Sequence, residues 1–99
     1  MQANDAQTLV LCVLAGGPLH GYAINTAIEE LVGERLGPGS LYGALTRLEA
    51  KELVEPAPGQ GRQRPMRLTP KGRQVLEQEL RSMAKVASTG LRNLGAAPA

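Results

Sequence analysis

The sequence has no tryptophan and no phenylalanine, and Tyr22 and Tyr42 are its only aromatic residues. An apolar core must therefore be built from leucine, valine, isoleucine, methionine and alanine side chains. At 99 residues the chain suffices for one domain. Chains of this size bury only about 60–70% of the surface that they expose when unfolded. We therefore expect the chain to gain stability when a second copy covers part of its apolar surface.

Cysteine and long apolar runs are also scarce. Cys12 is the only cysteine, so the sequence offers no internal disulfide and no cysteine-based metal cluster. We expect it to be a small core residue in a reducing compartment. The longest apolar run, Leu9–Ala15, is far too short to span a bilayer, and the N-terminus lacks the basic segment of a signal peptide. These features predict a cytoplasmic protein with no membrane partner.

Acidic residues are absent between Glu55 and Glu77. Residues 1–36 carry four acidic side chains and one basic one, whereas residues 70–99 carry two acidic and five basic ones. A local basic stretch without acids favours a polyanion as partner. The sequence shows no paired nucleophile and base, no phosphate-binding loop and no cluster of metal ligands. We therefore expect no enzyme, no cofactor and no metal, and a structural role for His20, the only histidine.

Residues 4–15 are expected to form the first helix, with Asn4 and Gln7 as a variant capping box. The run Leu9–Ala15 is apolar on all sides, which requires burial on both sides of the helix. We expect one side to face the chain's own core and the other a second subunit. The alternative is a central helix that its own chain surrounds completely.

Two further helices follow in close succession. The apolar spacing predicts the second helix over Leu19–Leu31, ended by Gly33, and the third over residues 38–50. Gly37 suits the N-cap of the third helix and Pro38 its first position. One face of this helix carries Leu41, Leu45 and Leu48, and the other carries Ser40, Tyr42, Gly43, Thr46 and Arg47. Two helices joined by so short a turn indicate a helix-turn-helix.

The period then changes from helix to strand. Residues 53–57 and 64–68 predict two strands of a hairpin, a wing, and Pro65 predicts that the second is an edge strand. Thr69 and Pro70 open a final helix. It carries an apolar stripe that extends beyond what a small core can cover and is expected to pack on the partner's first helix. The stripe comprises Leu76, Leu80, Met83, Ala87 and Leu91.

The expected fold class is mainly α with a minor β part, a winged helix-turn-helix. Three N-terminal helices precede a two-stranded wing, and one C-terminal helix serves dimerisation. Residues 1–69 form the DNA-binding domain, residues 70–94 the dimerisation helix of the same compact unit, and residues 95–99 a disordered tail.

Five segments resemble the PadR family of winged helix-turn-helix transcriptional regulators in their order and spacing. They are Gly17-Pro18-Leu19-His20-Gly21-Tyr22, Leu36-Gly37-Pro38-Gly39-Ser40-Leu41-Tyr42, Leu45-Thr46-Arg47-Leu48-Glu49, Gly61-Arg62 and Arg67-Leu68-Thr69-Pro70-Lys71-Gly72. The resemblance covers roughly residues 8–80. It implies a homodimer that binds double-stranded operator DNA and represses transcription, with the Ser-Leu-Tyr helix as recognition helix. The short C-terminus is similar to the small subfamily with one C-terminal helix.

The sequence departs from the family in two respects. The second wing strand reads Arg64-Pro65-Met66, where the family often has aromatic residues, which leaves the wing conformation open. A drug-binding member of the family stacks its ligand on tryptophan at the dimer interface, and this chain has no tryptophan. The residues therefore give no support for a small-molecule effector.

The predicted DNA contacts lie on the third helix, the wing and two helix starts. Arg47 is the first choice for a base contact, because arginine can bind guanine through two hydrogen bonds. The alternative for Arg47 is a surface pair with Glu49, and the alternative for Ser40 is local capping. For Tyr42 it is packing, half-buried, against the second helix, and for Arg62 and Arg64 it is a solvated charged hairpin. Packing is the more expected role for Tyr22, and a chance surface position is as expected for Lys71. The full set is Ser40, Tyr42, Thr46, Arg47, Arg62, Arg64, Tyr22 and Lys71.

The predicted dimer interface combines the first and last helices. Its residues are Leu9, Val10, Val13, Leu80, Met83, Ala87 and Leu91. The alternative function is a winged-helix module that binds another protein and never DNA, and the acid-free stretch favours DNA.

Overall fold

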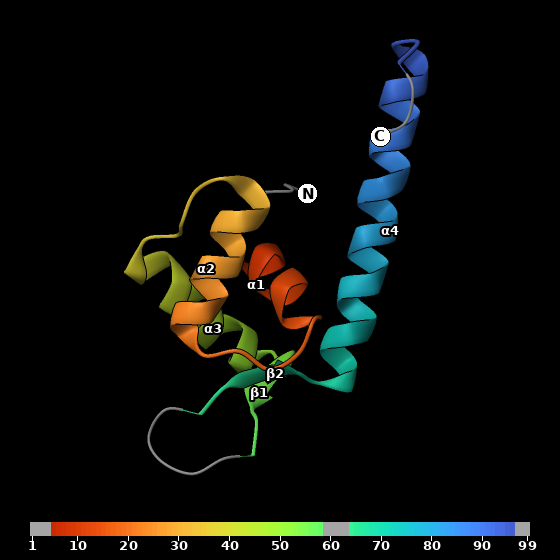
Figure 1. Ribbon diagram of the computed structural model, residues 1–99. Helices are drawn as coiled ribbons and strands as arrows, with labels where there is room; N and C mark the ends of the chain where they lie inside the picture. The colour runs from red at the N-terminus through yellow and green to blue at the C-terminus, as the bar shows by residue number, and fades with distance from the viewer. Residues whose placement is uncertain (1–4, 59–63, 97–99) are drawn as a thin grey trace.

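The computed structural model describes residues 5–58 and 64–96. Figure 1 shows three short helices packed together, a small sheet at their base and a long helix that stands to one side. The helices are α1 (Ala6–Leu14), α2 (Gly21–Val32), α3 (Pro38–Ala50) and α4 (Pro70–Asn93), and the strands are β1 (Val54–Pro56) and β2 (Met66–Leu68). This order confirms the predicted fold class.

The helix ends follow local capping chemistry. Asn4 of the predicted capping box lies outside the described residues, and the observed N-cap is Asp5. Its carboxylate accepts hydrogen bonds from the backbone N–H groups of Gln7 at 2.8 Å and Thr8 at 3.3 Å. Gly33 ends α2 with a φ of 90°, as predicted. Thr69 caps α4, because its hydroxyl oxygen accepts from the N–H of Gly72 at 2.9 Å.

The core draws on every helix and both strands. Val10, Ile24 and Ile28 are fully buried, and the three inward leucines of α3 are buried as predicted. The buried apolar cluster is Leu9, Val10, Leu11, Leu14, Ile24, Ile28, Leu41, Ala44, Leu45, Leu48, Leu53, Val54, Leu68 and Leu76. All of its members are aliphatic.

A buried amide holds the turn between α2 and α3. The side chain of Asn25 donates a hydrogen bond to the carbonyl oxygen of Leu36 at 2.8 Å and accepts one from its N–H at 2.8 Å. Asn25 is only 9% exposed, and an unpaired buried amide would be costly. The two bonds therefore fix the segment that leads into α3. The periodicity gives no hint of this role, because a polar residue on an apolar face looks like an interruption.

The two strands pair antiparallel, with Val54 opposite Leu68 and Pro56 opposite Met66. β2 is an edge strand of this two-stranded sheet, as predicted, although it begins after Pro65. Its outer edge is partly covered, because Met66 exchanges backbone hydrogen bonds with Leu19 at 2.9 and 3.0 Å. Leu19 is thus extended rather than helical, so α2 starts two residues later than predicted. The same pairing ties the wing to the start of α2.

Helix α4 packs on the core only through its first turns, where Gly72 and Leu76 are buried. Its second half projects away from the other elements (Figure 1). Of the tail predicted at 95–99, residues 97–99 lie outside the described part of the chain. Within residues 5–58 and 64–96, none of the helices combines the length and the apolar character needed to cross a membrane.

Candidate nucleic-acid interface

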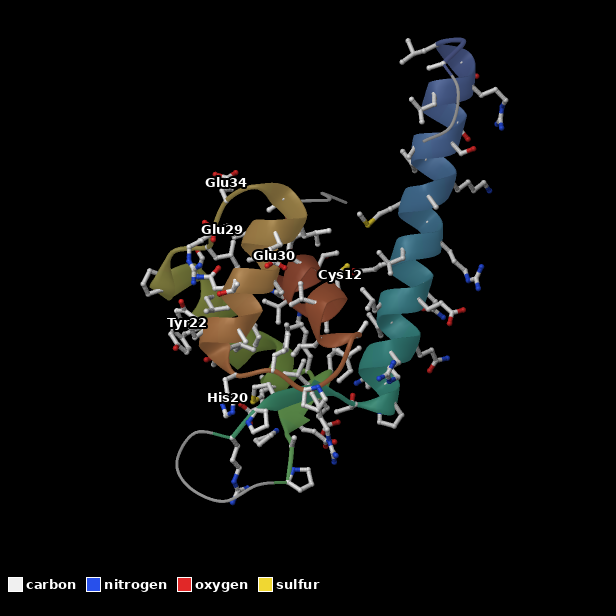
Figure 2. The ribbon with its side chains drawn as sticks, in the orientation of Figure 1. Cys12, His20, Tyr22, Glu29, Glu30 and Glu34 are labelled. Carbon is white, nitrogen blue, oxygen red and sulfur yellow. The ribbon has the colours of Figure 1, made fainter. Side chains whose placement is uncertain are left out.

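A hollow of about 430 Å³ opens between the start of α2, the middle of α3 and β2. Four of the predicted DNA-contacting residues line it, namely Tyr22, Tyr42, Thr46 and Arg64. The remaining lining residues are His20, Gly21, Leu45, Glu49 and Met66. In Figure 2, His20 and Tyr22 lie on the side of the molecule away from α4, whereas Cys12 lies toward α4. The fold therefore gathers side chains from the helices and the wing on one face.

The outward face of α3 presents its polar groups in distinct ways. Tyr42 is 58% exposed, and its ring reaches the start of α2. The hydroxyl of Thr46 donates a hydrogen bond to the carbonyl oxygen of Tyr42 at 2.8 Å. The hydroxyl proton of Thr46 is thereby occupied, while its methyl group stays available for contact with a thymine methyl.

Arg47 and Ser40 are exposed on the same helix but outside the hollow. The Arg47 guanidinium lies back over Gly43, so that a Cβ on Gly43 would be 3.1 Å from Nη1. Helical side chains lean toward the N-terminus, which accounts for this direction. Within the described part of the chain, Arg47 forms no ion pair with Glu49. Its guanidinium is therefore available on the surface of the helix.

Tyr22 does not fill the space between helices, since it is 79% exposed. The guanidinium carbon of Arg35 lies 5.4 Å from the centre of its ring, at cation–π distance. Arg35 also pairs with Glu29, with 3.1 Å between Nη1 and Oε1. The three side chains form a cluster on the surface of α2.

The other predicted contacts lie elsewhere. Lys71 does not line the hollow, and its Nζ donates a hydrogen bond to the carbonyl oxygen of Lys51 at the end of α3, at 3.2 Å. Arg62 lies outside the described residues. Arg67 on β2 pairs with Glu55 on β1, with 2.9 Å between Nε and Oε2.

Two residues of this face, Glu49 and Arg35, were not predicted from the sequence to belong to it. Glu49 follows Tyr42 and Thr46 by seven and three positions, so its helical spacing could have placed it on the same face. Arg35 lies in the irregular turn between helices, where periodicity carries no signal.

The predicted dimer residues fall into two groups. Leu9 and Val10 are 4% and 0% exposed within the chain's own core, which leaves them no surface for a partner. Val13 is half-buried on α1. On α4, Leu80 and Ala87 are exposed, whereas Met83 and Leu91 are half-buried. The apolar run of α1 is thus covered largely by its own chain.

Cys12 lies on α1, on the side toward α4 (Figure 2). Burial, and then the charge of Glu79, raises the pKa of the Cys12 thiol. Among the described residues no group of three histidine, cysteine, aspartate or glutamate side chains could hold a metal ion.

These features define a winged helix-turn-helix protein: a three-helix core, a hairpin joined to it through Met66 and Leu19, and a helix with a polar outward face. The sequence profile of the transcriptional regulator PadR-like family matches residues 10–78. The chain therefore belongs to the PadR-like family of transcriptional regulators.

Relatives and solved structures agree with this assignment. A 37.1-kDa protein of a Streptomyces fradiae transposon is 68% identical over 87 residues, which are 88% of this chain and 25% of that protein. The chain thus spans about a quarter of the length of this curated relative. The structure of H. salinarum RosR is similar with a TM-score of 0.72 and 30% identity, over 86% of this chain and 76% of RosR. A PadR family transcription regulator from Clostridium difficile has a TM-score of 0.68 and 30% identity, over 87% of this chain and 97% of that one.

Proposed function

We propose that the protein binds operator DNA as a homodimer and represses transcription. The hollow between α2, α3 and β2 carries this proposal, because it brings two phenols, a threonine and an arginine together on one face. Phosphate oxygens accept hydrogen bonds from the phenols and from arginine, and the neighbouring outward face of α3 can reach base edges.

In this arrangement α3 lies in the major groove. Arg47 contacts a guanine, for about 1–3 kcal/mol of discrimination against other bases. Ser40 binds a phosphate near the start of α3, where free backbone N–H groups attract anions. Tyr22 and Tyr42 donate to the backbone, Thr46 meets a base edge, and Arg62 and Arg64 of the wing reach the adjacent backbone or minor groove.

The charge of α2 supports the same orientation. Glu29, Glu30 and Glu34 gather around the C-terminal end of α2, as Figure 2 shows. The start of α2, which borders the hollow, carries no acidic residue before Glu29. A polyanion is therefore expected at the start of the helix and not at its end.

The homodimer rests on the stripe of α4. Leu80, Met83, Ala87 and Leu91 repeat at helical spacing beyond the part of α4 that the core covers. We place this stripe against the partner's α1, on the side of Cys12 and Val13 that its own core leaves half-buried. Two recognition helices then meet half-sites about 34 Å apart.

An electrophoretic shift with the DNA upstream of its own gene, repeated over a salt series, tests the proposal. The affinity should fall steeply as salt rises, because bound protein displaces counterions from the phosphates. Arg64→Ala should weaken binding, whereas Arg92→Ala removes the same charge from the far end of α4 and should not. Absence of a shift at low salt on any duplex would refute DNA binding and favour the protein-interaction module. Derepression of a reporter behind the same promoter on loss of the gene tests the repressor role.

The division of roles among the arginines has its own test. Arg47→Ala should lose preference for the operator over unrelated duplexes more than it loses total affinity. Arg62→Ala and Arg64→Ala should weaken all duplexes alike. Equal behaviour of the recognition-helix and wing variants would contradict this division.

A further inference from the structure

The ring of Tyr42 lies directly against the first residue of α2. A Cβ on Gly21 would be 3.2 Å from Oη of Tyr42, 3.5 Å from Cε1 and 3.6 Å from Cζ. The ring-carbon distances are those of ordinary contact, whereas the distance to the hydroxyl is shorter than side chains normally tolerate. A side chain at position 21 would therefore crowd the space that the phenol hydroxyl of Tyr42 occupies.

The backbone itself does not require glycine at this position. The described glycines with positive φ are Gly17, Gly33 and Gly95, and Gly21 is not among them. Gly21 is the first residue of α2, where any L-residue can adopt the helical conformation. The contact with Tyr42 thus remains as the physical reason for the missing side chain.

We propose that Gly21 is a positioning residue for Tyr42. The empty space above Gly21 holds the phenol hydroxyl at the start of α2, on the wall of the hollow, where a DNA phosphate can accept its hydrogen bond. This inference rests on the proposed DNA-binding function. It explains how the fold positions the Tyr42 hydroxyl before it contacts a phosphate.

The exposure of Tyr42 explains why such positioning matters. The side chain is 58% exposed, so burial alone does not fix the orientation of its ring. Contact with the start of α2 restricts the ring before DNA arrives, which reduces the conformational entropy that binding would otherwise lose. A methyl group at position 21 requires the hydroxyl to move by a few tenths of an ångström, which disturbs the contact that orients the ring.

A double-mutant cycle on DNA affinity tests the proposal, with Gly21→Ala, Tyr42→Phe and the double variant. Tyr42→Phe should weaken binding at least about 10-fold, through loss of one hydrogen bond to a charged acceptor. Gly21→Ala alone should weaken it about 3-fold, but should change the affinity of the Tyr42→Phe protein less than about 1.5-fold. The reason is that without the hydroxyl only the ring carbons, at 3.5 and 3.6 Å, face the new methyl group.

Independent effects that multiply in the double variant would overturn the proposal, because they would show that Gly21 acts without Tyr42. Absence of binding by the unmodified protein would instead refute the proposed function. Gly16→Ala is a matched control, since its Cβ would meet only the carbonyl oxygen of Val13 at 3.6 Å. Thermal unfolding of Gly21→Ala should occur at an unchanged or higher temperature, because alanine favours helix over glycine.

A second measurement needs no DNA. The chain has two tyrosines and no tryptophan, so Tyr22→Phe leaves Tyr42 as the only fluorophore. In that background Gly21→Ala should raise the acrylamide quenching constant of Tyr42 by roughly 1.5-fold, because the displaced ring is more accessible. Gly16→Ala should leave the constant unchanged. An unchanged constant for Gly21→Ala would overturn the proposal whatever the outcome with DNA.

Discussion

The two halves of α4 share one apolar periodicity but differ in what covers it. In the first half, residues 70–79, Leu76 is 4% exposed and Gly72 is buried against the rest of the chain. In the second half, residues 80–93, Leu80 is 39% exposed and Val86 is 66% exposed. The comparison teaches that periodicity identifies which face of a helix is apolar, whereas the length of the neighbouring elements decides how much of that face is covered.

Hydrogen bonds at its start and its end also anchor the first half. The hydroxyl of Thr69 donates to the carbonyl oxygen of Glu52 at 2.7 Å, and the N–H of Thr69 donates to that of Leu53 at 3.1 Å. Farther along, the hydroxyl of Thr8 on α1 donates to Oε2 of Glu79 at 3.3 Å. These bonds set the direction in which α4 leaves the core, and hence where its uncovered half meets a partner.

The largest effect is expected from Gly72→Ala. A Cβ there would clash with the carbonyl oxygen of Leu53, which is backbone and cannot turn away. We expect a loss of more than about 4 kcal/mol in the free energy of unfolding, at the extreme of single substitutions. Gly90→Ala makes the same change in the second half, where nothing in the described part of the chain, apart from the neighbouring residues and backbone of its own helix, lies within 4 Å of the new Cβ. Urea unfolding should show unchanged or higher stability for Gly90→Ala, and a comparable loss in both variants would contradict the comparison.

A pair of leucines one turn apart gives the next largest effect. Leu76→Ala should cost about 3 kcal/mol at every protein concentration, because it opens a cavity in the chain's own core. Leu80→Ala should cost less, and its effect should grow with protein concentration, because its contacts belong to the dimer. Unfolding curves at several concentrations separate the two. A concentration-independent loss for Leu80→Ala would place Leu80 in the core of the single chain.

A charge in the uncovered stripe should weaken the dimer and spare the fold. Met83→Glu buries a carboxylate at the proposed interface, and we expect the dimer dissociation constant to rise on the order of 30-fold, or about 2 kcal/mol. Lys85→Glu places the same side chain on the opposite, exposed face of α4 and should have little effect on association. Sedimentation equilibrium measures both. A Met83→Glu protein that remains a dimer would exclude the stripe as the interface.

The elements of the fold were largely predictable from sequence, because their signals are local. Gly37 and Pro38 at the start of α3, Gly33 at the end of α2 and Thr69 at the start of α4 act within one turn of the helix. What the sequence did not reveal are contacts between distant segments. The pairing of Met66 with Leu19 and the bonds of Asn25 to Leu36 depend on tertiary packing, which no periodicity encodes.

The residues of the candidate site also fall into two groups, those that helical spacing predicts and those that only tertiary packing brings together. Tyr42 and Thr46 were placed on the outward face of α3 by helical spacing, and the structure puts them in one hollow with Arg64 and Tyr22. The burial of Leu9 and Val10 could not be predicted, because an all-round apolar helix has no face that distinguishes its own core from a partner. The contact of Tyr42 with Gly21 likewise depends on the angle between α2 and α3.

The smallest predicted effect concerns Lys71, whose ammonium group lies at the junction of the anchored half with α3. Its hydrogen bond to the carbonyl oxygen of Lys51 places a positive charge at the C-terminus of α3, where the helix dipole favours cations. Lys71→Met should therefore lower the free energy of unfolding by about 0.5 kcal/mol. If this hydrogen bond is the whole role of Lys71, the slope of log affinity for DNA against log salt concentration should be the same for Lys71→Met as for the unmodified protein. If Lys71 instead meets a phosphate, as the sequence predicted, the slope should fall by about one unit, with affinity reduced on every duplex alike. The slope thus separates a contact that holds α4 on α3 from one that holds DNA.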